Sequence, residues 1–449
     1  MRIIIIGGVA AGAKAAAKSK RLLPDSEIHI YTQDTNVSYS SCGMPYYIAG
    51  DFKDWKKLLV RSVEEFEKSG IQIHTQHRVT QIIPEEKKVI VKDLKSASVQ
   101  EVFFDKLIIA TGAYPQIPEI KNNHLRNIFT LRRLEDSIAI KEQMERSKNI
   151  TVIGGGYIGI ELLEAFVKNN KNVTLVTKSP FVLSNFDEDI ASLVQTFILE
   201  NSNNQVKIIT EDEVDEFMGD VNVTGVKTHK GIGFETNMVV ISAGVQPVVD
   251  IAKDAGITIG QTGAIKVNSR METNIEDIYA CGDCTEKINM ISNTPMWLPL
   301  GSTANKEGRV AAVNACGGVE DFEGVLGSSV LRYGALSISM TGLTEKNAQK
   351  LGFDVVSVVI TKRDKAGYMP EVKNVTLKLI ADRRTHRVLG AQAIGCGDAD
   401  KRINTITVGL IHGMTVEHLL DVDLTYAPPF STSIDILISA ASVLKSKLY

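Results

Sequence analysis

Residues 150–177, ITVIGGGYIGIELLEAFVKNNKNVTLVT, indicate the fold of this chain. The apolar run Ile150–Ile153 is typical of a buried strand, and it is followed by the turn GGGYIG at 154–159. A helix to about Asn169 and a second strand over 172–177 complete the pattern. Glycines at this spacing permit a tight turn, close approach of a pyrophosphate to the backbone, and close helix–strand packing. The segment therefore predicts a Rossmann-like βαβ unit that binds a dinucleotide.

A second, weaker copy of this pattern opens the chain. The strand Ile3–Ile6 leads into GGVAAG at 7–12, an Ala-rich helix to about Leu23, and a strand over 27–31. Val9 stands at the central glycine position, and Asp34 is the nearest candidate for the acidic residue expected after the second strand. Two such units predict two nucleotide ligands, or one site and one degenerate copy.

The strand after GGGYIG ends in Thr177-Lys178-Ser179, without a carboxylate. An Asp or Glu at this position usually bonds the ribose 2′-hydroxyl of NAD. Lys178 could instead attract a 2′-phosphate, which favours NADPH. The alternative is that Lys178 is a solvated surface lysine and both cofactors are accepted.

Composition limits the class of protein. The 449 residues predict about three domains. A content of 44% hydrophobic residues is ordinary for a globular protein. The net charge of −3 gives no electrostatic reason to expect binding to nucleic acid or to an anionic membrane. Five cysteines favour a reducing, cytoplasmic location. The eight histidines show no metal-ligand spacing, so no metal is expected. The glycine-punctuated N-terminus is interpreted as a βα turn rather than a signal peptide, and no apolar run is long enough to cross a membrane.

Four motifs together carry a family resemblance. GGVAAG at 7–12, ATG at 110–112, GGGYIG at 154–159 and TNIEDIYACGD at 273–283 resemble the FAD- and NAD(P)-dependent pyridine nucleotide-disulfide oxidoreductases over essentially the whole chain. The resemblance implies an α/β fold with two Rossmann-like nucleotide-binding domains and a C-terminal α+β dimerisation domain. The expected boundaries are 1–115 and 246–325 for the two parts of the FAD domain, 116–245 for the NAD(P)H domain, and 326–449 for the dimerisation domain.

The resemblance also implies the residues that bind the cofactors. Asp283 would bond the ribityl chain of FAD, and Glu161 would lie near the nicotinamide. For FAD the expected set is Gly7, Gly8, Ala10, Ala11, Gly12, Thr32, Gln33, Ser41, Val79, Ala110, Thr111, Gly112, Asp283, Leu300, Thr303 and Ala304. For NAD(P)H it is Gly154, Gly156, Tyr157, Ile158, Gly159, Glu161, Lys178 and Gly244.

The subfamily depends on the cysteines near the flavin. Cys42 is followed at the C-x4-C spacing by Tyr47, so SYSSCGMPYY resembles the single-cysteine branch, which contains coenzyme A-disulfide reductase, NADH oxidase and NADH peroxidase. The oxidases and peroxidases have a His in the first glycine turn, which is absent here. The segments 366–368 and 425–429 resemble coenzyme A-disulfide reductase and its persulfide-reducing relatives. Ser41 before the cysteine is as in the oxidases, and Phe430 replaces a Tyr of the reductase motif. The chain ends soon after the C-terminal domain, so no fused rhodanese domain is expected.

Cys42 is the expected catalytic residue. Pro45 predicts that Cys42 lies at a helix N-terminus, where the helix dipole would lower the thiol pKa. The resemblance implies that electrons pass from NADPH by way of flavin to a mixed disulfide of Cys42 and coenzyme A. The released thiolate then attacks the next disulfide. Tyr426 and Tyr368 are candidate proton donors, which the resemblance places in the active site of the partner subunit of a homodimer.

Coenzyme A carries phosphates, so its entrance should be basic. Lys18 and Arg21 on the first helix are expected to bind the phosphates, and Ser38 and Ser41 the pantetheine arm. Two alternatives remain: an NAD(P)H oxidase or peroxidase that works through a Cys42 sulfenic acid, and a non-catalytic flavin redox sensor. Cys281 and Cys284 are expected to pack in the core, and Arg132 is expected to be solvated near a helix N-terminus.

Overall fold

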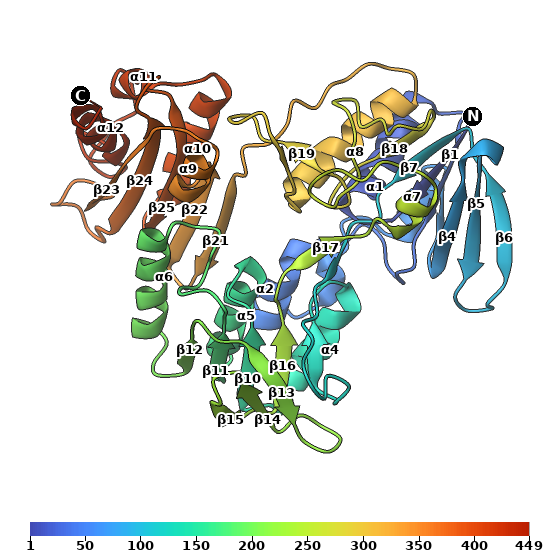
Figure 1. Cartoon of the computed structure of the whole chain (residues 1–449), viewed down its shortest axis with the longest axis horizontal. Helices are drawn as coiled ribbons and strands as arrows, with labels where there is room; N and C mark the ends of the chain where they lie inside the picture. Colours follow the sequence, from blue (N-terminus) through green and yellow to red (C-terminus); the bar gives the residue numbers. More distant parts are fainter. Residues whose placement is uncertain (449) are drawn as a thin grey trace.

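The computed structural model describes residues 1–448 and has three lobes (Figure 1). Residues from both the N-terminal part and the middle of the chain form one lobe, drawn in blue and yellow. This lobe is at the right of the view, and the C-terminal lobe, in orange and red, is at the left. The second lobe, in teal and green, lies below them. Two lobes are built on parallel sheets and the third on an antiparallel sheet. The predicted α/β fold class is therefore confirmed.

The first lobe is built on five parallel strands in the order β18-β7-β1-β2-β3. The central strand β1 has four consecutive isoleucines that are almost fully buried, as expected for a parallel strand covered on both faces. Helices α1 and α8 pack against each other closely, because Gly308 lies against Ala11 with no room for a side chain. The elements are β1 (Arg2–Ile6), α1 (Ala10–Leu22), β2 (Glu27–Tyr31), α3 (Val63–Lys68), β3 (Ile71–His74), β7 (Lys106–Ile109), α7 (Asp250–Asp254), β18 (Ile278–Ala280), β19 (Lys287–Ile288), β20 (Pro295–Met296) and α8 (Gly301–Ala315), with the antiparallel sheet β4 (His77–Ile83), β5 (Lys88–Asp93) and β6 (Val99–Phe103). Helix α2 (Met44–Ala49) comes from this part of the sequence but packs on the helices of the second lobe (Figure 1).

The second lobe repeats the architecture. Its parallel sheet has the order β12-β11-β10-β16-β9, and α5 packs on β10 and β11. The elements are β9 (Ile128–Thr130), α4 (Leu134–Arg146), β10 (Asn149–Ile153), α5 (Tyr157–Lys168), β11 (Asn172–Val176), α6 (Glu188–Glu200), β12 (Val206–Ile209) and β16 (Met238–Ile241), with the small sheet β13 (Val214–Met218), β14 (Gly225–Thr228) and β15 (Gly233–Glu235). The strands β8 (Ala113–Pro115) and β17 (Val245–Pro247) pair where the chain crosses between the two lobes.

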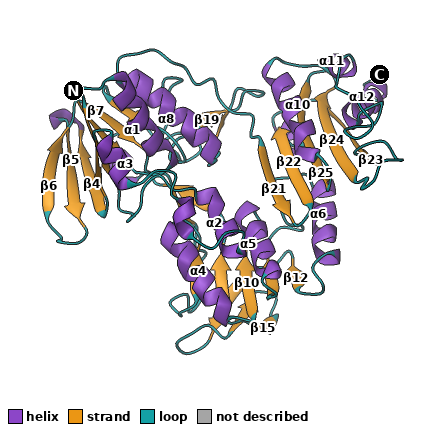
Figure 2. Ribbon diagram, turned by 180° about the vertical axis from the view of Figure 1, so that it is seen from behind, coloured by secondary structure: helices purple, strands orange, loops and turns teal. Residues whose placement is uncertain are grey.

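The C-terminal lobe is an antiparallel sheet in the order β21-β22-β25-β24-β23, with its helices packed on it (Figure 2). Antiparallel neighbours can be joined by short turns, whereas the parallel strands of the other two lobes need longer crossover connections, usually helices. The elements are β21 (Ser329–Tyr333), β22 (Leu336–Gly342), α9 (Glu345–Lys350), β23 (Val355–Arg363), β24 (Asn374–Asp382), β25 (Val388–Gly395), α10 (Ala399–Ile411), α11 (Val416–Leu420) and α12 (Ile436–Ser446).

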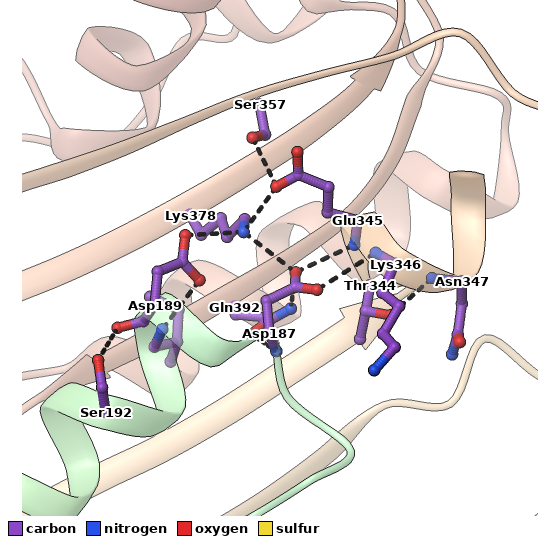
Figure 3. A network of polar contacts seen from close by, with 11 residues as sticks. Asp187, Asp189, Ser192, Thr344, Glu345, Lys346, Asn347, Ser357, Lys378 and Gln392 are labelled. Carbon is purple, nitrogen blue, oxygen red and sulfur yellow. Dashed lines mark hydrogen bonds and ion pairs between the residues drawn. The ribbon is translucent and has the colours of Figure 1, made fainter. Parts of the chain in front are cut away.

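A buried polar network joins the second lobe to the C-terminal lobe (Figure 3). The Lys378 ammonium group, on β24, lies 2.8 Å from Asp189 and from Glu345 and 3.3 Å from Asp187. Asp187 also accepts a hydrogen bond from Gln392 at 2.6 Å. The lysine side chain is only 3% exposed. The start of α6 is therefore fixed to the C-terminal sheet by one cation that faces three carboxylates.

Local predictions from the sequence are confirmed where they concern regular elements. The helix expected to end near Asn169 ends at Lys168, and the helix expected to end near Leu23 ends at Leu22. Cys281 and Cys284 are fully buried, as expected for packing residues. Within residues 1–448, no helix combines the length and apolar character that a membrane crossing requires.

Candidate active site

Two cavities meet at Cys42. The first, which we call the nucleotide cavity, has a volume of about 720 Å³ and lies between both glycine turns and β21. The second, which we call the outer cavity, has a volume of about 840 Å³ and lies between α1, α3 and the segment 38–42. Val9, Ala10, Ser41, Cys42 and Gly301 line both cavities. Cys42 therefore lies where the two cavities meet.

The local structure at Cys42 differs from the sequence-based expectation. Cys42 lies in a 3-10 turn, Ser41–Gly43, that precedes the six-residue helix α2. Its surface is open to the cavities, but surrounding protein still removes water from the thiol. This burial, followed by the carboxylates of Glu161 and Asp283, raises the pKa of Cys42, and the opposing effects of Ser41 and Arg132 are smaller. The expected lowering of this pKa is therefore wrong for the polypeptide alone.

The second glycine turn has the geometry of a dinucleotide cradle. Gly154 has φ +103°, and a Cβ there would lie 2.3 Å from the Ser242 carbonyl oxygen. A Cβ on Gly159 would lie 2.0 Å from the Gly154 carbonyl oxygen, so helix and turn touch. A Cβ on Gly156 would meet nothing within 4 Å, which leaves room for a pyrophosphate beside the N-terminus of α5. The predicted residues that line the cavity here are Gly154, Gly156, Tyr157, Ile158, Glu161, Lys178 and Gly244.

Acidic residues lie near Lys178 that the sequence did not reveal. Lys178 and Ser179 line the nucleotide cavity together with Asp212 and Glu213, which follow β12. The Asp212 N–H bonds the Thr177 carbonyl at 3.3 Å, which places this loop at the end of β11. The site therefore offers both an ammonium group and carboxylates to the adenosine ribose.

The first glycine turn fits a second nucleotide despite Val9. A Cβ on Gly12 would lie 1.9 Å from the Gly7 carbonyl oxygen, so this turn is as tight as the other. The residues predicted for FAD that line the nucleotide cavity are Ala10, Ala11, Ser41, Ala110, Gly112, Asp283, Leu300 and Ala304. Gly7, Gly8, Gly12, Thr32, Gln33, Val79, Thr111 and Thr303 are not among its lining residues in the described chain. The cavity-lining residues of this set would hold FAD beside this turn.

Arg132 is a site residue that sequence reasoning missed. Its guanidinium group lies 3.2 Å from the Asp283 carboxylate and lines the nucleotide cavity, rather than being merely solvated. Asp283 is also held through its carbonyl oxygen, which accepts a hydrogen bond from the Trp297 indole at 2.8 Å. The two ionic partners are 151 positions apart in sequence, so no local pattern could have paired them.

The outer cavity has a basic rim, but not the predicted one. Lys14, Arg61 and Lys68 line it together with one carboxylate, Glu65, whereas Lys18 and Arg21 are not among its lining residues in the described chain. Lys14 lies one turn before Lys18 on α1. The predicted Ser38 and Ser41 do line this cavity.

Glu161 has an unusual electrostatic environment. It lines the nucleotide cavity, and burial together with the nearby Glu164 raises its pKa to about 7. Glu164 lies 3.6 Å from Arg332, which also binds Asp51 at 2.9 Å. Glu161 can therefore exchange a proton near neutral pH close to the thiol.

Within one chain, Tyr368 and Tyr426 lie outside the two cavities at Cys42. Both are in loops of the C-terminal lobe, where their side chains are 77% and 52% exposed. The two loops are joined by a hydrogen bond from the Ala366 N–H to the Pro428 carbonyl. Neither tyrosine lines the cavities at Cys42 in the described chain.

Two glycine turns that can each hold a nucleotide line the same cavity as Cys42. This arrangement is typical of a nucleotide-dependent oxidoreductase that acts through a thiol. Comparison with known proteins identifies the family. Residues 1–308 match the pyridine nucleotide-disulphide oxidoreductase model, and residues 329–437 match the dimerisation domain of the same family. The chain belongs to this family of enzymes, which depend on FAD and NAD(P)H.

Three relatives illustrate the range of the family. The chain is 36% identical to an NAD(P)H coenzyme A polysulfide/persulfide reductase of Pyrococcus horikoshii over 99% of this chain and 98% of that protein. It is 32% identical to an NADH oxidase of Methanocaldococcus jannaschii over 100% and 99%. The structure of an NAD-dependent persulfide reductase from A. fulgidus superposes with a TM-score of 0.96 at 33% identity, covering 100% of this chain and 83% of that one.

Proposed function

We propose that this enzyme uses NAD(P)H to reduce coenzyme A disulfide, or a coenzyme A persulfide or polysulfide, through Cys42. The observation that carries the proposal is the position of the thiol between a nucleotide cavity and a separate, basic-rimmed cavity. A dinucleotide can occupy one side while the phosphorylated coenzyme A disulfide or persulfide occupies the other. Lys14, Arg61 and Lys68 would bind its phosphates, with Lys18 and Arg21 further along α1, and Ser38 and Ser41 would bond the pantetheine arm.

The residues at the cavity junction support the following cycle. The Cys42 thiolate attacks one sulfur of the substrate, so that a Cys42–sulfur bond forms, the substrate S–S bond breaks, and a coenzyme A thiolate leaves. The leaving thiolate takes up a proton. FAD, when bound, supplies the two electrons from NAD(P)H that return the mixed disulfide to two thiols. Arg132 and Ser41 favour the Cys42 thiolate.

The proposal includes a homodimer in the cytoplasm. The 329–437 region matches a dimerisation domain, and this lobe exposes Val408, Phe430 and Ile434. In the dimer, Tyr426 and Tyr368 would reach the Cys42 site of the other subunit and donate a proton to the leaving thiolate. The five cysteines are free, as in a reducing compartment.

The rival function is reduction of O2 or peroxide through a Cys42 sulfenic acid. The NADH oxidase relative and the Ser41 that precedes the cysteine favour it. The basic outer cavity has no role in that chemistry, which is why we favour a coenzyme A disulfide or persulfide as the substrate.

Anaerobic consumption of NADPH separates the candidates. With coenzyme A disulfide, two coenzyme A thiols should appear for each NADPH consumed. With coenzyme A persulfide, one thiol and one sulfide should appear. Cys42→Ser should abolish both reactions. No anaerobic consumption, followed by brisk oxidation when O2 or peroxide is admitted, would establish the oxidase or peroxidase instead.

A further inference from the structure

A buried ion pair lies behind the loop that carries Asp283. Lys287, on β19, and Glu307, in the middle of α8, have side chains that are 1% and 0% exposed, and their charged atoms are 3.4 Å apart. Neither residue lines the nucleotide cavity in the described chain, whereas Gly282 and Asp283 do. Burying two charges has a large desolvation cost, and a buried ion pair is therefore weak evidence of stabilisation. A specific positioning role is a better physical explanation for this pair.

The ion pair holds both peptide groups that flank Gly282. The Gly282 N–H donates to Glu307 Oε2 at 2.6 Å, and the Gly282 carbonyl oxygen accepts from Lys287 Nζ at 2.8 Å. The Thr285 hydroxyl lies between the two charges and the turn: its oxygen accepts from Lys287 Nζ at 3.0 Å and is 2.8 Å from the Gly282 carbonyl oxygen and 3.1 Å from Glu307 Oε2. Gly282 has φ +87°, a conformation that favours glycine. The orientation of this turn is thus set by charges on the side away from the cavity.

This arrangement aims a hydrogen-bond donor at the cavity. In a trans peptide the carbonyl and the next N–H point in opposite directions. Because the Gly282 carbonyl points to Lys287, the Asp283 N–H points away from the ion pair. Within residues 1–448 this N–H has no acceptor. Asp283 therefore presents an unused amide donor, and a carboxylate held by Arg132 at 3.2 Å, to the same cavity.

We propose that Lys287 and Glu307 are positioning residues for the flavin cofactor. They hold the Gly282–Asp283 turn so that the Asp283 N–H and carboxylate face the FAD. Asp283, which lines the cavity, makes the contact, and the ion pair acts through it. The inference depends on FAD binding beside Asp283 and not on which disulfide the enzyme reduces. The positioning role can therefore be wrong while the proposed substrate is right, and the proposed substrate can be wrong while the positioning role is right.

The test measures how tightly the full-length holoenzyme retains FAD. Lys287→Met keeps the length of the side chain but removes its charge and its hydrogen bonds to Gly282 and Thr285. Lys287→Arg restores the charge. Arg309→Gln is the control, because Arg309 lies on α8 two residues after Glu307 and binds Glu320 on the exposed side of the helix. Flavin fluorescence reports the rate at which FAD is released, and the visible spectrum of the bound flavin reports its surroundings.

We expect Lys287→Met to release FAD at least about tenfold faster and to shift the flavin spectrum, while its far-UV circular dichroism stays native. Lys287→Arg should recover much of the retention, and Arg309→Gln should match the original protein within about twofold. A folded Lys287→Met protein with unchanged release and an unchanged spectrum would overturn the proposal. If Lys287→Met does not fold, Glu307→Gln, which keeps an acceptor for the Gly282 N–H, decides the question by the same two measurements.

Discussion

The thiol of Cys42 lies against Gly301, the first residue of helix α8. A Cβ built on Gly301 would be 3.7 Å from Cys42 Sγ. Helix α8 has fifteen residues, whereas α2, which follows Cys42 in sequence, has six. The positive end of a helix dipole favours a nearby anion. The helix that can stabilise the Cys42 thiolate is therefore α8, which approaches from 259 positions away, rather than the one that sequence proximity suggested.

Gly301→Ala should hinder the disulfide at this contact. The φ of Gly301 is not positive, so alanine fits the backbone and should not destabilise the helix. The added methyl group would occupy space between the two cavities beside the thiol. We expect kcat/KM for the disulfide to fall about tenfold, which is within the range of effects that one extra methyl group has in a binding pocket. Stopped-flow reduction by NADPH, with FAD content as the control, should show a much smaller change; equal losses in both half-reactions would contradict this explanation.

Lys178 should set the preference between the two nicotinamide cofactors. It lines the cavity at the end of β11, where Asp212 and Glu213 are also found. Lys178→Ala removes the cation that can attract a 2′-phosphate and leaves the carboxylates that repel it. We expect kcat/KM for NADPH to fall about tenfold, which corresponds to about 1.4 kcal/mol, with little change for NADH. Steady-state kinetics with both cofactors checks this, and an equal fall for both would show that Lys178 does not discriminate.

Lys378→Met should weaken the junction between the second and C-terminal lobes. The substitution would leave Asp187, Asp189 and Glu345 close together without their shared cation. Removing one member of a buried ionic cluster typically costs about 3–5 kcal/mol. Urea denaturation of the holoenzyme should show a loss of this size.

The matched control for this prediction is Lys401→Met in the same lobe. Lys401 binds Asp398 at 2.9 Å, but the pair is largely exposed. An exposed ion pair contributes between zero and about 1 kcal/mol. Similar losses for both variants would mean that the Lys378 network does not fix the lobes together.

Glu161 should make stability depend on pH. Its pKa is raised from an ordinary value of 4.5 to about 7, so the folded protein holds a proton that the unfolded chain releases. Stability is therefore lost as the pH rises from about 4.5 through 7. Glu161→Gln removes this loss, so it should stabilise the protein by up to about 3 kcal/mol at pH 8 and by much less near pH 5. Urea titrations of the polypeptide without cofactors at both pH values measure this difference, and Glu142→Gln, on the exposed face of α4, is the control. A pH-independent effect of Glu161→Gln would contradict the raised pKa.

The sequence predicted regular elements and turns well because their causes are local. The isoleucines of β1 and the glycines of 154–159 determine a strand and a turn within a few residues. The cavity surroundings depend on contacts between distant segments. Arg132 was expected in solvent because its partner Asp283 comes from another lobe. The basic rim was assigned to Lys18 and Arg21 rather than Lys14, since the sequence shows a helix face but not how far along it the cavity extends. The pKa of Cys42 could not be predicted because burial and Glu161 both depend on the assembled site.

Tyr426 provides a test of whether two subunits share each active site. It is about half exposed in one chain and does not line the cavities of its own Cys42 in the described residues. If it acts in the other subunit, a site needs Cys42 from one chain and Tyr426 from its partner. Tyr426→Phe homodimers should then turn over much more slowly than the original protein, and Cys42→Ser homodimers should be inactive.

Mixed dimers of the two variants should recover activity. In a Cys42→Ser/Tyr426→Phe heterodimer, one of the two sites combines an intact Cys42 with an intact Tyr426. Random exchange of equal amounts should make half of the dimers heterodimers, so about one quarter of the original activity should return. The measurement is disulfide-dependent oxidation of NADPH before and after subunit exchange. If Tyr426 acted within its own chain, each heterodimer would have only defective sites and exchange would restore nothing. Tyr368→Phe paired with Cys42→Ser applies the same logic to the second tyrosine, whose side chain is 77% exposed.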